Sequence, residues 1–402
     1  MEDQKEISTS YAPAVRIDAS KRGPMSIART IWKSSLRGYS LVLIVGVIWL
    51  GFQILTGGTY LTQRNLGLLA LQTSITGLTA VGAVILISCR NFDLSIGSVL
   101  ELLSVVMAIL SIRQGWGPWS TIAVVMVLGI ALGAWQGWWV AKLGVPSFIV
   151  SLAGMLYFRG LALTLADGET IAPVPKSLGI ISTGWLSPFQ SIGLIAAGLL
   201  VLSLYVIFRA HRAKKLGLAE RLWPAALRSI TPVLLFTLVA GYVATFRGIP
   251  YLVLLLAAAA LAGVFVTTST RLGQQIYAVG SNPEAARLSG IDPSSTVLKA
   301  WIIEGVIYGV AAVALTTRVT GAIPGSGIFI ELDAIASAII GGTSLSGGSG
   351  TVLGGLLGAL LMKSLDNGMG LMNVKTFYQY ISKGVVLLIA VYIDMRARRG
   401  NS

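Results

Sequence analysis

Eight ionisable side chains interrupt stretches of sequence that are otherwise apolar. They are Glu101, Arg159, Glu304, Glu331, Asp333, Lys363, Asp366 and Lys383. An ionisable group inside an apolar helix is costly, so it is expected to pair with an opposite charge or to line a polar pathway. Glu101 and Glu304 can each pair with Arg159 or Lys383 as structural contacts. The sequence shows no series of several carboxylates buried at mid-membrane, although ion-coupled transporters often need such a series.

The side chains of common catalytic and metal sites are scarce. His211 is the only histidine and Cys89 the only cysteine, which excludes a histidine cluster, an intrachain disulfide and a cysteine-based zinc site. No GxxxxGK[ST] motif is present, and the glycine-rich stretch 339–350 lacks the lysine that binds phosphates. We therefore expect no enzyme activity, no metal and no cofactor in this chain. ATP, if it is used, must be hydrolysed with Mg²⁺ on another subunit.

The segment SNPEAARLSGI at 281–291 predicts a short helix between two apolar stretches. Asn282 is a favourable N-cap, Pro283 suits the first helical position, and Glu284 lies where the helix dipole favours a carboxylate. Gly290 can end the helix. The pattern is compatible with a connector on the membrane surface and with a helix that docks into another protein. In a docked helix, the small side chains of Ala285 and Ala286 would allow close approach.

Composition places these residues in a membrane protein. Of 402 residues, 54% are hydrophobic and 11% charged, against roughly 25% charged in soluble proteins. Mean hydropathy is +0.79. So few charges cannot cover so much apolar surface in water, whereas lipid is itself an apolar solvent. The fold class is therefore an all-α, polytopic integral membrane protein, located in the cell (inner) membrane.

The apolar pattern predicts about twelve membrane-spanning helices. They cover roughly 40–55, 66–88, 94–112, 120–141, 147–166, 189–208, 230–246, 250–268, 297–317, 329–345, 351–365 and 376–394. The stretches 66–88, 329–345 and 351–365 are rich in Gly, Ser and Thr, so we expect them to be bent or broken.

Basic residues orient these helices. With both termini in the cytoplasm, 21 of the 30 Lys and Arg residues lie on the cytoplasmic side and six outside, which agrees with the positive-inside rule. The net charge of +14 therefore reflects cytoplasmic loops rather than nucleic-acid binding. The expected organisation is a cytoplasmic tail at 1–39 without a signal peptide, a transmembrane domain at 40–394 and a tail at 395–402. Two cytoplasmic loops are expected inside the domain, a basic one at 209–229 and one at 269–296 that carries the short helix.

Several long motifs together resemble one family. NFDLSIGS (91–98), AWQGWWVAKLGVPSFIVSLAGMLYFRG (134–160), GQQIYAVGSNPEAARLSGI (273–291), ELDAIASAIIGGTSLSGGSGTVLGGLLGAL (331–360) and SLDNGMGLMNVKTFYQYISKG (364–384) are similar to the ribose/xylose-type permeases of bacterial ATP-binding-cassette sugar importers. The order of the motifs also matches. The extra stretch at about 189–246 and the WQGWWVAK run resemble the D-xylose permeases most, with ten core helices and two added ones.

The resemblance implies the partners and the site. It implies a homodimer, a cytoplasmic ATPase that holds ATP and Mg²⁺, and an extracytoplasmic sugar-binding protein that delivers a monosaccharide. It assigns contact with the ATPase to a coupling helix, made of Asn282, Pro283, Glu284, Ala285, Ala286, Arg287, Leu288, Ser289 and Gly290.

The polar stretches at 93–98 and 341–347 then become candidates for the pathway. Glu101 and Asp333 are added because they are carboxylates within apolar stretches. The candidates for the pathway are then Asp93, Ser95, Gly97, Ser98, Glu101, Asp333, Thr343 and Ser344. Asp93 can also simply cap the following helix. The principal alternative function is an ion-coupled secondary sugar transporter, which would need neither an ATPase nor a binding protein. A membrane-embedded enzyme is disfavoured because no nucleophile with a base is visible.

Overall fold

A computed structural model describes residues 41–215, 237, 240–242 and 244–399. The predicted tail at 1–39 and most of the predicted helix at 230–246 lie outside the described residues, as does the greater part of the basic loop at 209–229. Within the described part the secondary structure is helical, apart from isolated β-bridges such as Ile171 with Ala322.

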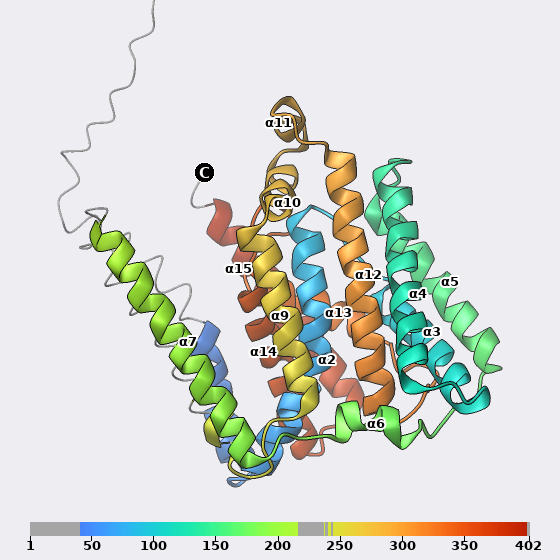
Figure 1. Cartoon of the computed structure of the whole chain (residues 1–402), viewed down its shortest axis with the longest axis vertical. Helices are drawn as coiled ribbons and strands as arrows, with labels where there is room; N and C mark the ends of the chain where they lie inside the picture. Colours follow the sequence, from blue (N-terminus) through green and yellow to red (C-terminus); the bar gives the residue numbers. More distant parts are fainter. Residues whose placement is uncertain (1–40, 216–236, 238–239, 243, 400–402) are drawn as a thin grey trace, which may run out of the picture. The chain divides into compact units, whose positions relative to one another are not determined.

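The helices follow the predicted order (Figure 1). After an apolar helix at Leu41–Leu55, the chain forms α2 (Gln63–Ser88), α3 (Ile96–Ala108, continued by a π-helical turn at Ile109–Arg113), α4 (Pro118–Ala141), α5 (Ser147–Ala166), α6 (Lys176–Thr183), α7 (Pro188–Lys215), α9 (Tyr251–Ser269), α10 (Arg271–Ser281), α11 (Pro283–Leu288), α12 (Pro293–Arg318), α13 (Ile330–Ile340), α14 (Val352–Leu371) and α15 (Thr376–Arg399). Six of the described helices are long and apolar enough to cross a membrane.

Several predicted bounds change. The stretch at 66–88 is not broken, because α2 is a continuous helix of 26 residues. Of the other two stretches expected to bend, only one is broken: α13 ends at Ile340 and a non-helical segment follows to Thr351, whereas α14 is continuous. Helix α7 continues to Lys215, into the predicted loop, and α15 continues to Arg399, into the predicted C-terminal tail.

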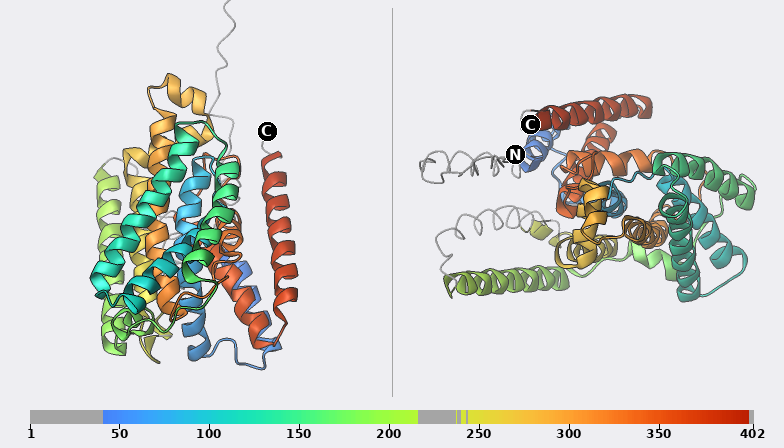
Figure 2. Two further views of the ribbon diagram at one scale, coloured as in Figure 1. Left: turned by 90° about the vertical axis from the view of Figure 1, so that its right-hand side faces the viewer. Right: turned by 90° about the horizontal axis from the view of Figure 1, so that it is seen from above.

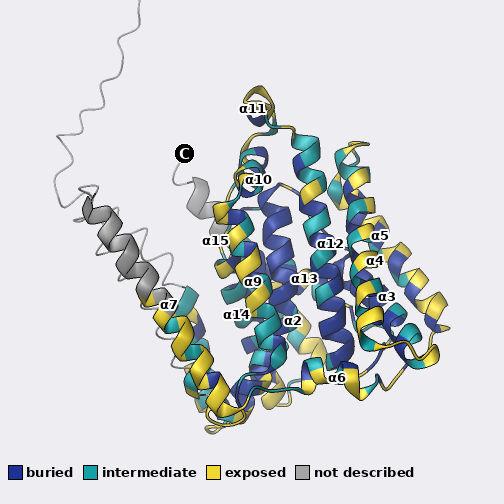
Figure 3. Cartoon of the chain, in the orientation of Figure 1, coloured by how far each residue is buried: buried dark blue, intermediate teal, exposed yellow. Residues whose placement is uncertain are grey.

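Helix α2 lies at the centre of the bundle. It packs against α9, α12, α13 and α14, which surround it in both views of Figure 2. Figure 3 shows α2 and much of α12 buried, whereas α4, α5 and α7 expose apolar outer faces such as those of Trp135, Leu156 and Phe189. An apolar exterior around a partly polar interior is what a lipid environment favours.

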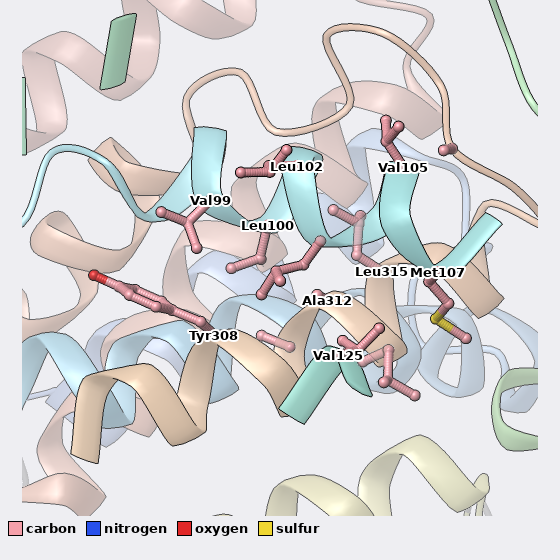
Figure 4. Packing of buried hydrophobic residues seen from close by; sticks show 14 of the residues in the cluster. Val99, Leu100, Leu102, Val105, Met107, Val125, Tyr308, Ala312 and Leu315 are labelled. Carbon is pink, nitrogen blue, oxygen red and sulfur yellow. The ribbon is translucent and has the colours of Figure 1, made fainter. Parts of the chain in front are cut away.

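Glycines allow α4 to pack closely against α12. Gly129, Gly133 and Gly137 are four residues apart on one face of α4 and meet Trp301, Gly305 and Gly309 of α12. A Cβ at Gly133 would overlap the Trp301 carbonyl oxygen. Small residues at this spacing let backbones approach closely in membranes. Figure 4 shows Tyr308, Ala312 and Leu315 of α12 packed among Val99, Leu100 and Val125.

The two ends of the segment predicted to add two helices lie side by side, next to the end of α6 and the start of α9. Leu186 N–H donates to the Ile249 carbonyl (2.9 Å), and Tyr251 N–H donates to the Gly184 carbonyl (3.0 Å). Ser191 Oγ accepts from Ile249 N–H at 2.9 Å. The chain therefore leaves the bundle after α6 and returns beside the same residues at the start of α9; of the two helices predicted between these points, the structure describes α7.

Candidate functional site

The short helix predicted at 283–289 is α11, at the top of Figure 1. The Asn282 side-chain oxygen accepts from the backbone N–H groups of Glu284 and Ala285, both at 3.0 Å, which is the geometry of an N-cap. Gly290 has a φ of +81°, a conformation that glycine adopts without strain. The cap and stop signals in the sequence therefore act as predicted.

Helix α11 has one face against its own protein and one face free. Ala286 is buried against the cluster that contains Ile276 and Val279 of α10. The expectation that both alanines allow a partner to approach is therefore wrong for Ala286, because its side chain points inward. Ala285 and Leu288 are exposed, and 80% of Leu288 is accessible.

Charge and apolar surface combine on the free face. The exposed Glu284 and Arg287 form an ion pair at 3.0 Å, one turn apart. Glu284, Arg287 and the neighbouring Leu288 therefore leave one face of α11 open to solvent.

Asp93 lies in a buried ring of polar side chains from three elements. Its Oδ1 accepts from the Ser95 N–H (2.7 Å) and faces the Ser95 hydroxyl at 2.6 Å, and its Oδ2 accepts from the Tyr308 hydroxyl at 2.5 Å. Gln136 Nε2 donates to the Tyr308 hydroxyl at 3.1 Å, and Gln136 Oε1 lies 3.0 Å from Ser95 Oγ. The ring joins the segment before α3 to α4 and α12.

The ring is one proton short when Asp93 is ionised. The Ser95 hydroxyl has one hydrogen but faces two acceptors, Asp93 Oδ1 and Gln136 Oε1. A protonated Asp93 can donate to Ser95, which then donates to Gln136, so that every contact in the ring holds a hydrogen. We infer that Asp93 is neutral in the folded chain.

Two replacements of Asp93 test this proton count. In Asp93→Asn the amide supplies the missing hydrogen once the Gln136 amide turns over, so we expect the free energy of unfolding to change by less than about 1 kcal/mol. Asp93→Ala leaves buried donors without partners and is expected to cost about 1–3 kcal/mol. Thermal unfolding of the purified protein measures both changes. Equal destabilisation by Asn and Ala would contradict a neutral Asp93.

The predicted pathway residues are all buried in this conformation, and they fall in separate places. Gly97 and Ser98 follow Asp93 and Ser95 into α3, where a Cβ at Gly97 would overlap the Gly327 carbonyl oxygen. Glu101, one turn further, accepts from Gly325 N–H at 2.7 Å. These residues form a group around the start of α3, and no comparison or contact tests their role in transport.

Asp333 belongs to a different arrangement, a cluster of four charges. Its carboxylate lies 2.5 Å from Lys363 Nζ and 3.0 Å from Lys383 Nζ, and Asp366 lies 2.9 Å from each lysine. The cluster is electrically neutral and joins α13, α14 and α15. Lys383 therefore pairs with neither Glu101 nor Glu304, because the two aspartates hold it.

Thr343 and Ser344 lie in the non-helical segment after α13. This segment packs on the ends of α2 and α10: Gly348 N–H donates to the Ser88 carbonyl at 2.9 Å, and a Cβ at Gly280 would overlap the same carbonyl oxygen. The segment is thus in contact with α10, the helix that precedes α11.

Two participants in the polar ring were not singled out from the sequence: Gln136 and Tyr308. Gln136 is a lone amide within an apolar stretch, a signal that was available in the sequence. Tyr308 and Glu304 are four residues apart on one face of α12. Both oxygens of Glu304 are buried without a hydrogen-bond partner. Among the residues that the structure describes, no group of His, Cys, Asp and Glu could hold a metal ion.

Comparison with known proteins identifies the family. Residues 65–391 match the family model described as branched-chain amino acid transport system / permease component. The xylose transport system permease protein XylH of Escherichia coli (strain K12) is 41% identical over 91% of this chain and 93% of its own length. XylH of Haemophilus influenzae is 40% identical over 90% of this chain and 96% of its own length.

The ribose import permease protein RbsC of Escherichia coli (strain K12) is 32% identical over 83% of this chain and 87% of its own length. No solved structure matches the chain significantly. The family model is named after amino acid transport, whereas these relatives are sugar permeases. With apolar helices that fit a multi-pass protein, the chain belongs to this family of membrane permeases, in the group that includes the xylose and ribose permeases of bacterial sugar importers.

Proposed function

We propose that this chain is the membrane-spanning subunit of an importer that carries D-xylose inward, driven by ATP that a separate subunit hydrolyses. The identity to xylose permeases along nine-tenths of the chain carries the substrate assignment. The resemblance of the stretch at about 189–246 to the D-xylose permeases also supports it. The working unit is a homodimer with a pair of cytoplasmic ATPases and an extracytoplasmic binding protein.

The free face of α11 supports the proposed coupling. Movement of a docked ATPase would act first on α11 and, through the buried Ala286, on α10. Helix α10 in turn approaches the Ser88 carbonyl at Gly280, and Gly348 of the segment at 341–350 donates a hydrogen bond to that carbonyl. The movement would therefore reach the segment at 341–350. That segment ends the broken helix α13. Binding of ATP and of the loaded binding protein would then bias an equilibrium between inward-open and outward-open states.

Reconstitution tests the function. The permease, its ATPase and its binding protein are placed in liposomes, and uptake of labelled sugars is followed. We expect uptake that needs ATP and both partners, with xylose preferred over ribose and galactose. A preference for another sugar class would contradict the substrate assignment but leave an ATP-driven permease.

The alternative, ion-coupled transport, has one observation in its favour. Glu304 is a buried carboxyl without a hydrogen-bond partner, and a carboxyl at membrane depth can bind and release a proton. Uptake by the permease alone, driven by a proton gradient and abolished in Glu304→Gln, would establish this function instead.

Orientation is tested with single cysteines. We propose that both termini and α11 face the cytoplasm. Burial raises the pKa of the Cys89 thiol to about 12, so the reactive thiolate is scarce at neutral pH and the native cysteine should stay unlabelled. In intact cells, an impermeant maleimide should label Ser187→Cys, which is exposed before α7, and should spare Ser289→Cys beside α11. Labelling of Ser289→Cys alone would reverse the orientation.

A further inference from the structure

Buried polar atoms without partners gather at one place in the bundle. Among the described residues, fourteen buried side-chain nitrogen and oxygen atoms lack a hydrogen-bond partner. Five of them belong to residues of α3, α5, α13 and the loop before α13: Glu101 Oε2, Arg159 Nε and Nη2, Ser326 Oγ and Glu331 Oε2. Unused hydrogen-bonding groups are rare in native interiors, so a concentration of them calls for water, an ion or a ligand to complete their hydrogen bonds.

Contacts show that the two carboxylates and the guanidinium converge. Glu101 and Gly97 lie four residues apart on α3, and a Cβ at Gly97 would overlap Glu331 Oε2. Arg159 Nε lies 3.8 Å from Glu101 Oε2. Ser326 stands between Gly325, whose N–H binds Glu101, and Gly327, where a Cβ would lie 3.4 Å from the Glu101 Cβ.

The Arg159–Glu101 pair is spaced so that a hydroxyl can bridge it. At 3.8 Å, Arg159 and Glu101 attract each other but do not form a hydrogen bond. An oxygen placed about 2.8 Å from each atom would accept from the guanidinium and donate to the carboxylate. Glu331 Oε2 and Ser326 Oγ offer a second acceptor and a hydroxyl nearby. The group thus presents both donors and acceptors, as adjacent sugar hydroxyls require.

Charge and access restrict the ligand further. Two carboxylates with one guanidinium disfavour an anion, and Arg159 disfavours a metal ion in the same space. Glu101 and Glu331 are 1% and 6% exposed, whereas the Arg159 side chain is 27% exposed and its neighbour Gly160 is open. Arg159 therefore lies between the buried carboxylates and the exposed face of α5. A neutral polyhydroxy molecule fits this arrangement.

Helix α3, which carries Glu101, lies away from α11. Figure 1 shows α3 nearer to α6 than to α11. Phe329, two residues before Glu331, has a φ of +66°, a strained conformation for a non-glycine residue. Backbone strain of this kind clusters at ligand sites.

We propose that Glu101, Arg159, Ser326 and Glu331 form a transient binding site for the hydroxyl groups of a monosaccharide on its way through the permease. The inference rests on the proposed sugar-import function. It adds a site in the permease that contributes to specificity, separate from the binding protein.

Direct binding is measured with D-xylose and the permease–ATPase complex in nanodiscs, without binding protein. Saturation-transfer NMR detects weak binding, and we expect transfer to xylose in the wild type and in the control Arg113→Gln, an exposed charge at the end of the α3 helix. Glu331→Gln keeps the shape of the side chain and should lower the transfer at least fivefold. No transfer in the wild type, or equal transfer in Glu331→Gln and the wild type, would overturn the site.

Transport separates this role from a structural one. With loaded binding protein, Glu331→Gln and Arg159→Gln should still hydrolyse ATP at rates near wild type, while xylose moved per ATP falls at least tenfold. Arg159→Lys, which keeps the charge, should recover part of the ratio. An unchanged ratio in Glu331→Gln would overturn the site although the wild type transports, whereas failure of the wild type to import any sugar would refute the proposed function itself.

Discussion

Replacing Ala285 with tryptophan should lower sugar uptake at least tenfold. It should lower the stimulation of ATP hydrolysis by loaded binding protein by at least the same factor. Ala285 is exposed on the free face of α11, beside Leu288 and the Glu284–Arg287 pair. A bulky ring there cannot enter a packed interface. The same change on an unoccupied surface would alter stability by less than about 0.5 kcal/mol. Uptake, ATPase activity and copurification of the ATPase measure the effect.

Two further variants separate docking from folding. Ala286→Trp places the same ring on the inward face, against Ile276 and Val279, and should lower the yield and thermal stability of the permease by itself. Leu143→Trp adds bulk at an exposed residue of the α4–α5 connection and should leave uptake intact. Full transport by Ala285→Trp would reduce α11 to a surface connector and remove the basis of the coupling proposal.

Removing one aspartate from the four-charge cluster should destabilise the protein strongly. Asp333→Asn leaves Lys363 and Lys383 with one carboxylate, Asp366, between them. Loss of one partner from a buried ion pair costs about 3–5 kcal/mol, because the remaining charge stays desolvated. Lys383 is the only charge that α15 contributes to the cluster, so we expect α15 to detach first. Thermal unfolding and protease cleavage near α15 report this.

A neutral double variant provides the control. Asp333→Asn with Lys363→Met keeps the Lys383–Asp366 pair at 2.9 Å and restores zero net charge. It should regain most of the stability that the single variant loses. If both variants unfold at the same temperature, the charges do not determine how α15 is held, and apolar packing does.

Local signals explain what could be predicted from the sequence. The membrane class follows from composition alone, because few charges cannot cover so many apolar side chains in water. The bounds of α11 follow from Asn282, Pro283 and Gly290, since capping depends on residues next to each other in the chain. The break after α13 was also predicted, because the Gly- and Ser-rich stretch favours non-helical backbone.

Contacts between distant residues could be decided only by the tertiary structure. A helical pattern shows that Asp333, Lys363 and Lys383 are buried ionisable residues, but several pairings satisfy the same charges. The packing of α13, α14 and α15 selects one of them. The inward face of α11 could not be assigned either, because six residues are too few to define an apolar stripe, and Ala286 is buried only since α10 folds beneath it. The grouping of Glu101 with Arg159 and Glu331 likewise depends on how closely α3 approaches the loop before α13, which the absence of a side chain at Gly97 and Gly327 permits.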